Sequence, residues 1–197
     1  GSGLLYIGTG TGGVDRVLPN GKAFNILLEE SVWKIFEDSE QTMWFCMDGS
    51  GVKNYNPDTG EIRRFRYNAD DPGSLPTDSV FTGIATSQGE LWFGTRRGVW
   101  VFDQEGEFLT NLTTNNSPLV SNDVLSLATD PSNGKIYIGT RIGLSEVQSL
   151  SIKPRQNFDI FCYPQPFKPE RDEEMIIEGL APDTDLRIVT INGELVK

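Results

Sequence analysis

Arginines at two turn positions are the residues of this 197-residue chain best suited to bind a ligand. Arg96 and Arg97 follow the segment LWFGT, and Arg141 follows the closely similar segment IYIGT. A guanidinium group carries five N–H donors in a rigid plane, which suits carboxylates and other oxyanions. We predict that Arg96, Arg97 and Arg141 bind an anionic sugar or a carboxylate. The alternative is that they lie on a solvated loop without a ligand.

The composition excludes several kinds of chemistry. The chain has no histidine, so it contains no Ser-His-Asp triad, no histidine-ligated zinc and no phospho-accepting histidine. Its 28 acidic and 17 basic residues give a net charge of −11, which disfavours nucleic acid as a partner. No apolar run approaches the roughly 18 residues of a membrane span. We predict no enzyme activity, no cofactor and no metal, and no transmembrane segment in this chain.

The two cysteines, Cys46 and Cys162, are too few for a disulfide framework or a four-cysteine zinc site, so each is predicted to be an isolated buried thiol. The stretch GTGTGG at residues 8–13 fits a dinucleotide-binding pattern, but Pro19 and a turn follow where that pattern requires a helix. We predict a turn there. We also predict that Trp33 and Trp100 pack between structural units rather than stack on carbohydrate.

Six aspartates could in principle supply paired carboxylates for a lyase or glycosidase. Most of them lie in segments rich in turn-forming residues, where the aspartate side chain bonds nearby backbone N–H groups. Turn formation is therefore the preferred interpretation for the six: Asp38, Asp48, Asp70, Asp71, Asp78 and Asp130.

One unit occurs four times along the chain. The copies read LLYIGTGTGGVDRV, TMWFCMDGSGVKNY, ELWFGTRRGVWVF and KIYIGTRIGLSEV. Their anchor aromatics, Tyr6, Trp44, Trp92 and Tyr137, are 38, 48 and 45 residues apart, near the length of one four-stranded propeller blade. Each copy predicts two adjacent antiparallel strands joined by a tight turn.

The segments between the copies complete the blades. Apolar segments at 32–36, 80–84 and 124–127 predict inner strands, and NPDTGEIRRFRY and DQEGEFLTNL predict charged outer strands. Small residues recur within the repeat, and we attribute them to close approach of neighbouring backbones: Gly8, Cys46, Gly94 and Gly139. Glycines also recur at the end of the turn, which predicts a positive φ: Gly13, Gly51, Gly98 and Gly143.

The strings LWFGTRRGVWVF and KIYIGTRIGL, with the segments before them, resemble the two-component regulator propeller repeats of bacterial extracytoplasmic proteins. The resemblance covers residues 4–147. The repeat itself predicts an all-β fold with three to three and a half four-stranded blades at residues 1–156, because no inner strand precedes the first copy and the last unit ends near Val147. Because closed propellers have four to eight blades, we expect further blades of a parent chain, or a second copy, to complete the ring.

From residue 157 the pattern changes. YPQPF, followed by IIEGLAPDTDLRIVTINGELV, resembles the opening half of the Ig-like C-terminal sorting domain of type IX secreted and surface proteins. Residues 157–197 are therefore predicted to begin a second, truncated β-module. Predicted strands lie at 175–177 and 186–191, with a hairpin turn at 192–193. Together with the repeats, this segment is similar to the propeller-bearing surface component of that secretion machinery.

The sequence is consistent with three functions. The first is a non-enzymatic extracytoplasmic module that binds a ligand, a glycan or a surface protein, and is linked to type IX secretion. The second, which the repeat family implies, is the periplasmic ligand-sensing input region of a hybrid two-component receptor. The third is a propeller polysaccharide lyase or hydrolase, suggested by the fold class alone.

Overall fold

The computed structural model describes residues 4–130, 132–148, 161–163, 168, 170–171 and 174–178. The chain divides into two compact units, Gly1–Lys153 and Pro154–Lys197. The predicted boundary between residues 156 and 157 lies outside the described residues. No helix long and apolar enough to cross a membrane occurs in the part of the chain that the structure describes.

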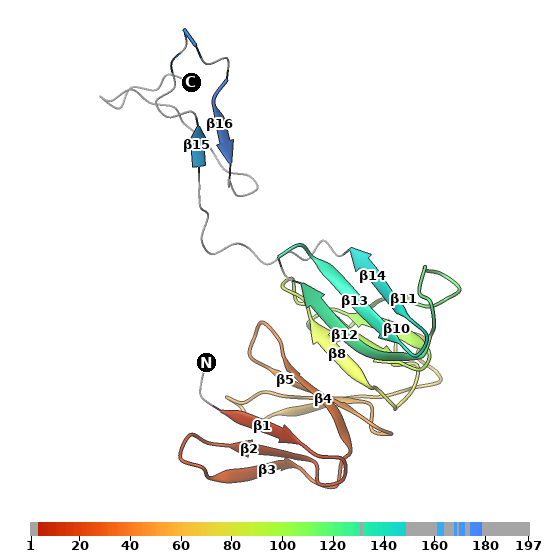
Figure 1. Ribbon diagram of the computed structural model, residues 1–197. Helices are drawn as coiled ribbons and strands as arrows, with labels where there is room; N and C mark the ends of the chain where they lie inside the picture. Colours follow the sequence, from red (N-terminus) through yellow and green to blue (C-terminus); the bar gives the residue numbers. More distant parts are fainter. Residues whose placement is uncertain are drawn as a thin grey trace. The chain divides into compact units, whose positions relative to one another are not determined.

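The first unit contains four antiparallel sheets that follow one another in sequence (Figure 1). We call them blades 1 to 4. Blade 1 consists of β1 (Leu5–Gly8), β2 (Val14–Val17) and β3 (Ala23–Leu27). Blade 2 consists of β4 (Val32–Glu37), β5 (Met43–Met47), β6 (Val52–Tyr55) and β7 (Ile62–Phe65). Blade 3 consists of β8 (Thr82–Ala85), β9 (Leu91–Thr95), β10 (Gly98–Phe102) and β11 (Phe108–Leu112). Blade 4 consists of β12 (Val124–Asp130), β13 (Lys135–Thr140) and β14 (Leu144–Gln148).

Strands within each blade pair in the order in which they occur along the chain. The first strands of blades 2, 3 and 4 contact one another from blade to blade, and β1 contacts β4, so these strands form the inner side of the unit. The predicted inner strands are confirmed, although β8 begins two residues later than expected. Within the described residues, blade 1 has no inner strand before β1 and blade 4 has no outer strand after β14.

The core consists of three clusters, each between two neighbouring blades. Strand β5 shows why: Met43, Phe45 and Met47 pack against blade 1, whereas Trp44 and Cys46 pack against blade 3. All five residues of β5 are buried, because both faces of blade 2 are covered. A strand covered on both faces reads as a continuous apolar run rather than as an alternation.

The recurring glycines face side chains of the inner strand of their own blade, of the next blade, or of both. A Cβ at Gly94 would lie 2.6 Å from Thr82 Cγ2 and 2.7 Å from Val124 Cγ1. A Cβ at Gly8 would similarly lie 2.9 Å from Val32 Cγ1. The predicted need for a small side chain is therefore confirmed at these positions, but its cause was wrong: packed side chains of the same or the next blade fill the space, not backbone.

The turn-ending glycines have a backbone reason. Gly13, Gly51 and Gly98 have φ values of +88°, +75° and +116°, as predicted. A Cβ at each would also lie within 2.5 Å of the carbonyl oxygen that ends the outer strand of its own blade. Gly143 departs from the prediction, because its φ is not positive. Blade 4 has no outer strand in the described residues, so no such carbonyl approaches Gly143.

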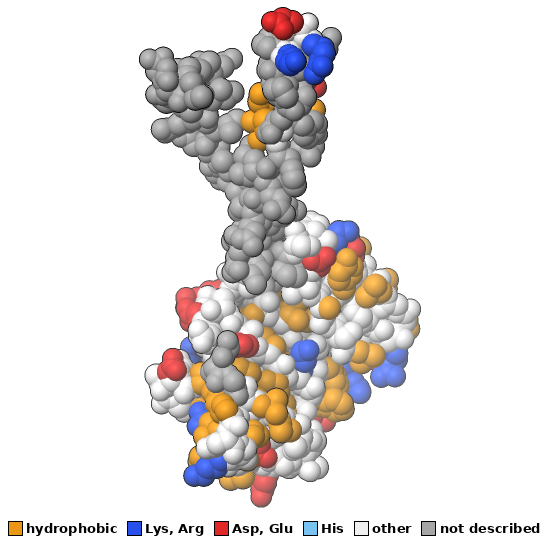
Figure 2. All heavy atoms as spheres, turned by 60° about the vertical axis from the view of Figure 1, so that its left-hand side comes forward, with side chains coloured by type: hydrophobic (Ala, Val, Ile, Leu, Met, Phe, Trp, Pro, Cys, Tyr) orange, Lys and Arg blue, Asp and Glu red, His pale blue; other side chains and the backbone are white. Residues whose placement is uncertain are grey.

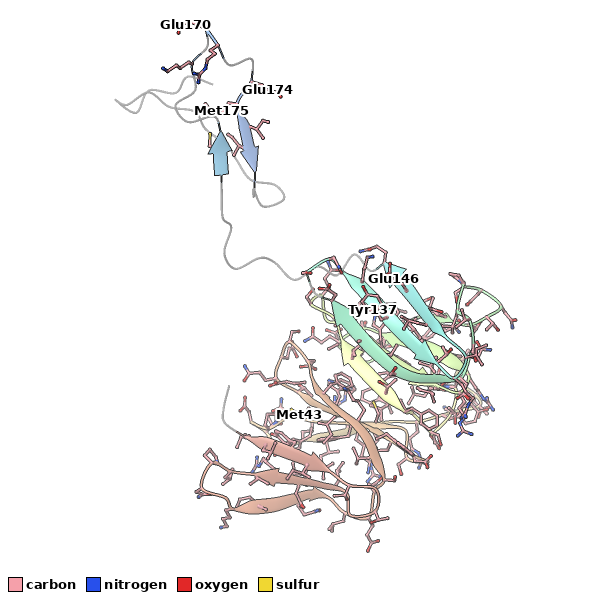
Figure 3. All side chains as sticks on the ribbon, in the orientation of Figure 1. Met43, Tyr137, Glu146, Glu170, Glu174 and Met175 are labelled. Carbon is pink, nitrogen blue, oxygen red and sulfur yellow. The ribbon has the colours of Figure 1, made fainter. Side chains whose placement is uncertain are left out.

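The face of blade 4 that points away from blade 3 carries both aromatic and charged side chains. Ile136 and Ile138 are buried against blade 3, so Tyr137 between them lies on the opposite face. Tyr137 is half-buried and pairs across the sheet with Glu146, as Figure 3 shows. Lys135 Nζ lies 2.9 Å from Glu146 Oε1. Figure 2 shows that hydrophobic side chains also reach the surface of the first unit.

The described part of the second unit is a pair of antiparallel strands, β15 (Phe161–Tyr163) and β16 (Ile176–Glu178). Strand β16 matches the strand predicted at 175–177 within one residue. The predicted strand at 186–191 and the turn at 192–193 lie outside the described residues, so the Ig-like module stays a prediction. Both cysteines are free; Cys46 is buried as predicted, but Cys162 is only half-buried.

Candidate ligand-binding site

A surface cavity of about 500 Å³ lies between the turns of blades 2 and 3. This volume is within the range of small-molecule sites. It is lined by residues of both blades and of the segment between them: Trp33, Asp48, Thr77, Ser79, Phe81, Arg96 and Arg97. Two of the three predicted arginines, Arg96 and Arg97, thus line one cavity together with two aromatic side chains.

Equivalent backbone hydrogen bonds position the two aromatic side chains. Trp33 follows Val32 as the second residue of β4, and Phe81 follows Val80 and directly precedes β8. The Val80 N–H donates to the carbonyl of Met47 in the preceding blade at 2.9 Å, and the Val32 N–H donates to that of Thr9 at 3.0 Å. Each aromatic residue is therefore fixed at a blade boundary.

Trp33 and Phe81 contact each other edge to face, with ring centroids 5.7 Å apart. Trp33 nevertheless stays 56% exposed, so packing between blades accounts for only part of its surface and the prediction for this residue was incomplete. Trp100, by contrast, packs against the core between blades 2 and 3, as predicted. The exposed indole of Trp33 can stack on an apolar ligand face.

The two lining arginines are held by the turn between β9 and β10. Thr95 Oγ1 accepts from the Arg97 N–H and donates to the Gly98 carbonyl, both at 3.0 Å, which fixes the turn. The Arg97 Nη1 donates to the carbonyl of Pro76 at 3.1 Å. The guanidinium of Arg96 lies over the Phe81 ring, 5.3 Å from its centroid, in cation–π geometry.

The two acidic residues near the arginines have different hydrogen-bond partners. Asp48 lies in the cavity wall and accepts a hydrogen bond from Ser79 Oγ at 2.7 Å. Asp123 accepts from Arg141 Nε at 2.7 Å, and that hydrogen bond and charge raise the pKa of the Arg141 guanidinium. Arg141 does not line the cavity, so the third predicted arginine is placed beside the site and is paired.

The cavity therefore combines three chemical features. Two guanidinium groups supply donors for an oxyanion, and their charge exceeds that of the single carboxylate in the wall. Asp48, Thr77 and Ser79 offer partners for hydroxyl groups. Trp33 offers an exposed ring. From the sequence, Trp33 was assigned to packing and Asp48 to a turn, and Thr77, Ser79 and Phe81 were not singled out. The shared position of Trp33 and Phe81 in the repeat was the available signal.

The other candidate residues have structural roles. Asp38 is buried, accepts from the Trp44 indole at 2.7 Å and accepts from the N–H groups of Glu40 and Thr42 at 2.9 Å. It faces a smaller polar depression of about 170 Å³. Among the described residues there is no group of three or more acidic or cysteine side chains able to hold a metal ion. Gly8 ends β1, and residues 9–13 form the predicted turn to β2.

Comparison with known proteins supports the fold. No family model and no curated protein matches the chain. The extracellular domain of BT3049 from B. thetaiotaomicron is 24% identical, with a TM-score of 0.64 over 82% of this chain and 24% of that one. The extracellular domain of BT4673 from B. thetaiotaomicron is 22% identical, with a TM-score of 0.60 over 81% and 21% of the two chains.

A third similar structure is the WD40 β-propeller domain of Doa1, 17% identical, with a TM-score of 0.56 over 76% of this chain and 47% of that one. At these identities the similarity concerns the fold alone. The chain has an all-β fold whose four blades form part of a β-propeller, which confirms the predicted fold class. It spans about a quarter of the length of BT3049 and BT4673.

Proposed function

We propose that this chain is a non-enzymatic, extracytoplasmic bacterial module that binds an acidic glycan in the cavity between blades 2 and 3. The observation that carries the proposal is the joint exposure of Trp33, Arg96 and Arg97 in one cavity. A sugar ring would stack on Trp33 while its carboxylate accepts hydrogen bonds from the two guanidinium groups. The extracellular position of the similar BT3049 and BT4673 domains supports the proposed location.

The test is calorimetric titration with a trimer of galacturonic acid, and with its methyl ester as the neutral probe. Replacing Arg96 and Arg97 together by alanine should weaken binding of the acid at least tenfold, because a charge-assisted hydrogen bond contributes about 1.5–3 kcal/mol. Arg64→Ala, on the exposed outer strand β7, removes a charge outside the cavity and should leave the affinity unchanged.

Trp33→Ala separates stacking from charge recognition. It should weaken binding of the acid and of the ester alike, because ring stacking does not depend on the charge of the carboxylate. If neither probe binds the wild-type protein, or if the double arginine variant binds as well as Arg64→Ala, the proposed site is wrong. Cleavage of the acidic trimer by the protein would favour the lyase or hydrolase alternative.

A second candidate is the ligand-sensing input region of a two-component receptor. The similarity to BT3049, which is described as a hybrid two-component system, favours it. A histidine kinase would require residues outside this chain, because the chain has no histidine. The proposed link to type IX secretion rests on the sequence of residues 157–197. Fusing this segment to a reporter and measuring its export from a type IX-competent strain tests that link.

A further inference from the structure

A carboxylate outside the cavity wall lies beside one of the ligand-binding arginines. Asp123 directly precedes β12 of blade 4, and its side chain is 24% exposed. Its Oδ2 accepts the hydrogen bond from Arg141 Nε. Its Oδ1 is buried without a hydrogen-bond partner and lies 3.9 Å from Arg96 Nε. This distance is too long for a hydrogen bond but short enough for a substantial charge interaction.

The contact has a counterpart one blade earlier. Ser79 precedes Val80 in the same way that Asp123 precedes Val124, and Asp48 holds the turn position in blade 2 that Arg96 holds in blade 3. Ser79 Oγ donates a full hydrogen bond to Asp48 Oδ1 at 2.7 Å. At the boundary between blades 3 and 4 the turn residue, Arg96, is a cation, and the residue before the inner strand, Asp123, is an acid. There the two groups do not form a hydrogen bond.

Arg96 is therefore held loosely from two sides. The Phe81 ring lies under its guanidinium, and Asp123 attracts it without bonding to it. The arginine side chain is 67% exposed, so its donor groups stay open to an oxyanion. Any anion that binds Arg96 must compete with the Asp123 carboxylate for the same positive charge, and that carboxylate also repels the anion.

We propose that Asp123 is a specificity-determining residue that lowers the affinity of the cavity for anionic ligands by competing with them for Arg96. This inference rests on the proposed function, because it assigns a control to the same site. The ligand class is defined by charge: Asp123 lowers the affinity for the carboxylate of an acidic glycan and does not change the affinity for its neutral rings. The orphaned Oδ1 is the atom through which it acts.

The experiment compares Asp123→Asn with wild type by titration with the galacturonic acid trimer and its methyl ester. Asparagine keeps the size of the side chain and removes its charge. Affinity for the acid should rise about twofold to fivefold, in line with a surface charge pair of this separation. Affinity for the ester should not change. Asp123→Glu, which keeps the charge, should stay close to wild type.

Asp58→Asn is the matched control, because it removes the same charge from an exposed residue of the β6–β7 turn, outside the cavity. Equal gains in both asparagine variants would mean that net charge alone acts, and this would overturn the inference. An unchanged or lower affinity for the acid in Asp123→Asn would also overturn it, while binding by the wild type would leave the proposed function intact. If no variant binds either probe, both proposals fail.

Discussion

Gly94 offers the sharpest test of how neighbouring blades are held together. Its position on β9 faces the inner strands of blades 3 and 4. A methyl group there would lie 2.6 Å from Thr82 Cγ2 and 2.7 Å from Val124 Cγ1, and both neighbours are buried. Val124 belongs to the core cluster that joins the two blades, and Thr82 Oγ1 accepts a hydrogen bond from the Leu127 N–H at 3.2 Å, so neither side chain is free to move away. Gly94→Ala should therefore be destabilising despite its small size.

The expected magnitude follows from two opposing effects. Overpacking a core by one methyl group costs about 1–3 kcal/mol. Replacing glycine by alanine also restricts the unfolded chain, which offsets about 0.4–1 kcal/mol of that cost. The central values leave a net loss of about 1.3 kcal/mol, which would lower the melting temperature by about 3–5 °C for a domain of this size. Urea unfolding followed by tryptophan fluorescence measures it directly.

Two other glycines serve as controls. Gly10 has no heavy atom within 4 Å of the position its Cβ would take, so Gly10→Ala should change the stability by less than about 0.5 kcal/mol. A Cβ at Gly139 would strike only Ser126 Oγ, the end of an exposed side chain that can rotate away, so Gly139→Ala should lie between the two. Equal stability of Gly94→Ala and Gly10→Ala would refute the packing argument.

Three further outcomes are expected. Asp38→Ala should lower the free energy of unfolding by about 2–3 kcal/mol in urea titration, because it leaves the buried Trp44 indole without its acceptor; an effect below 0.5 kcal/mol would contradict this. Burial raises the pKa of the Cys46 thiol, so Cys46 should react with a thiol reagent at pH 8 only after unfolding. Although burial opposes it, hydrogen bonds from Lys53 and Ser50 hold the pKa of Glu30 below its usual value. The stability that Glu30 contributes is therefore present above about pH 4.5 and lost as the pH falls through its lowered pKa, and Glu30→Gln should remove this part of the acid dependence measured by thermal melts.

Much of the blade structure was predictable from the sequence, because strands and turns depend on residues close together in the chain. The repeat placed the four anchor strands, the charged outer strands and the tight turns. It also identified the positions at which Gly13, Gly51 and Gly98 need a positive φ. Gly143 was the exception, since a close outer-strand carbonyl accompanies the positive φ at the other three glycines, and blade 4 has no outer strand in the described residues.

The binding cavity was only partly predictable, because it forms between blades. Trp33 and Arg97 are separated by more than 60 residues of sequence, and nothing in the local pattern shows that Trp33 stays exposed while Trp44 is buried. The repeat predicted that the arginines lie in turns. Only the tertiary structure decided that Arg96 and Arg97 line the cavity while Asp123 pairs with Arg141, because such contacts depend on how two blades pack and not on the sequence of either one.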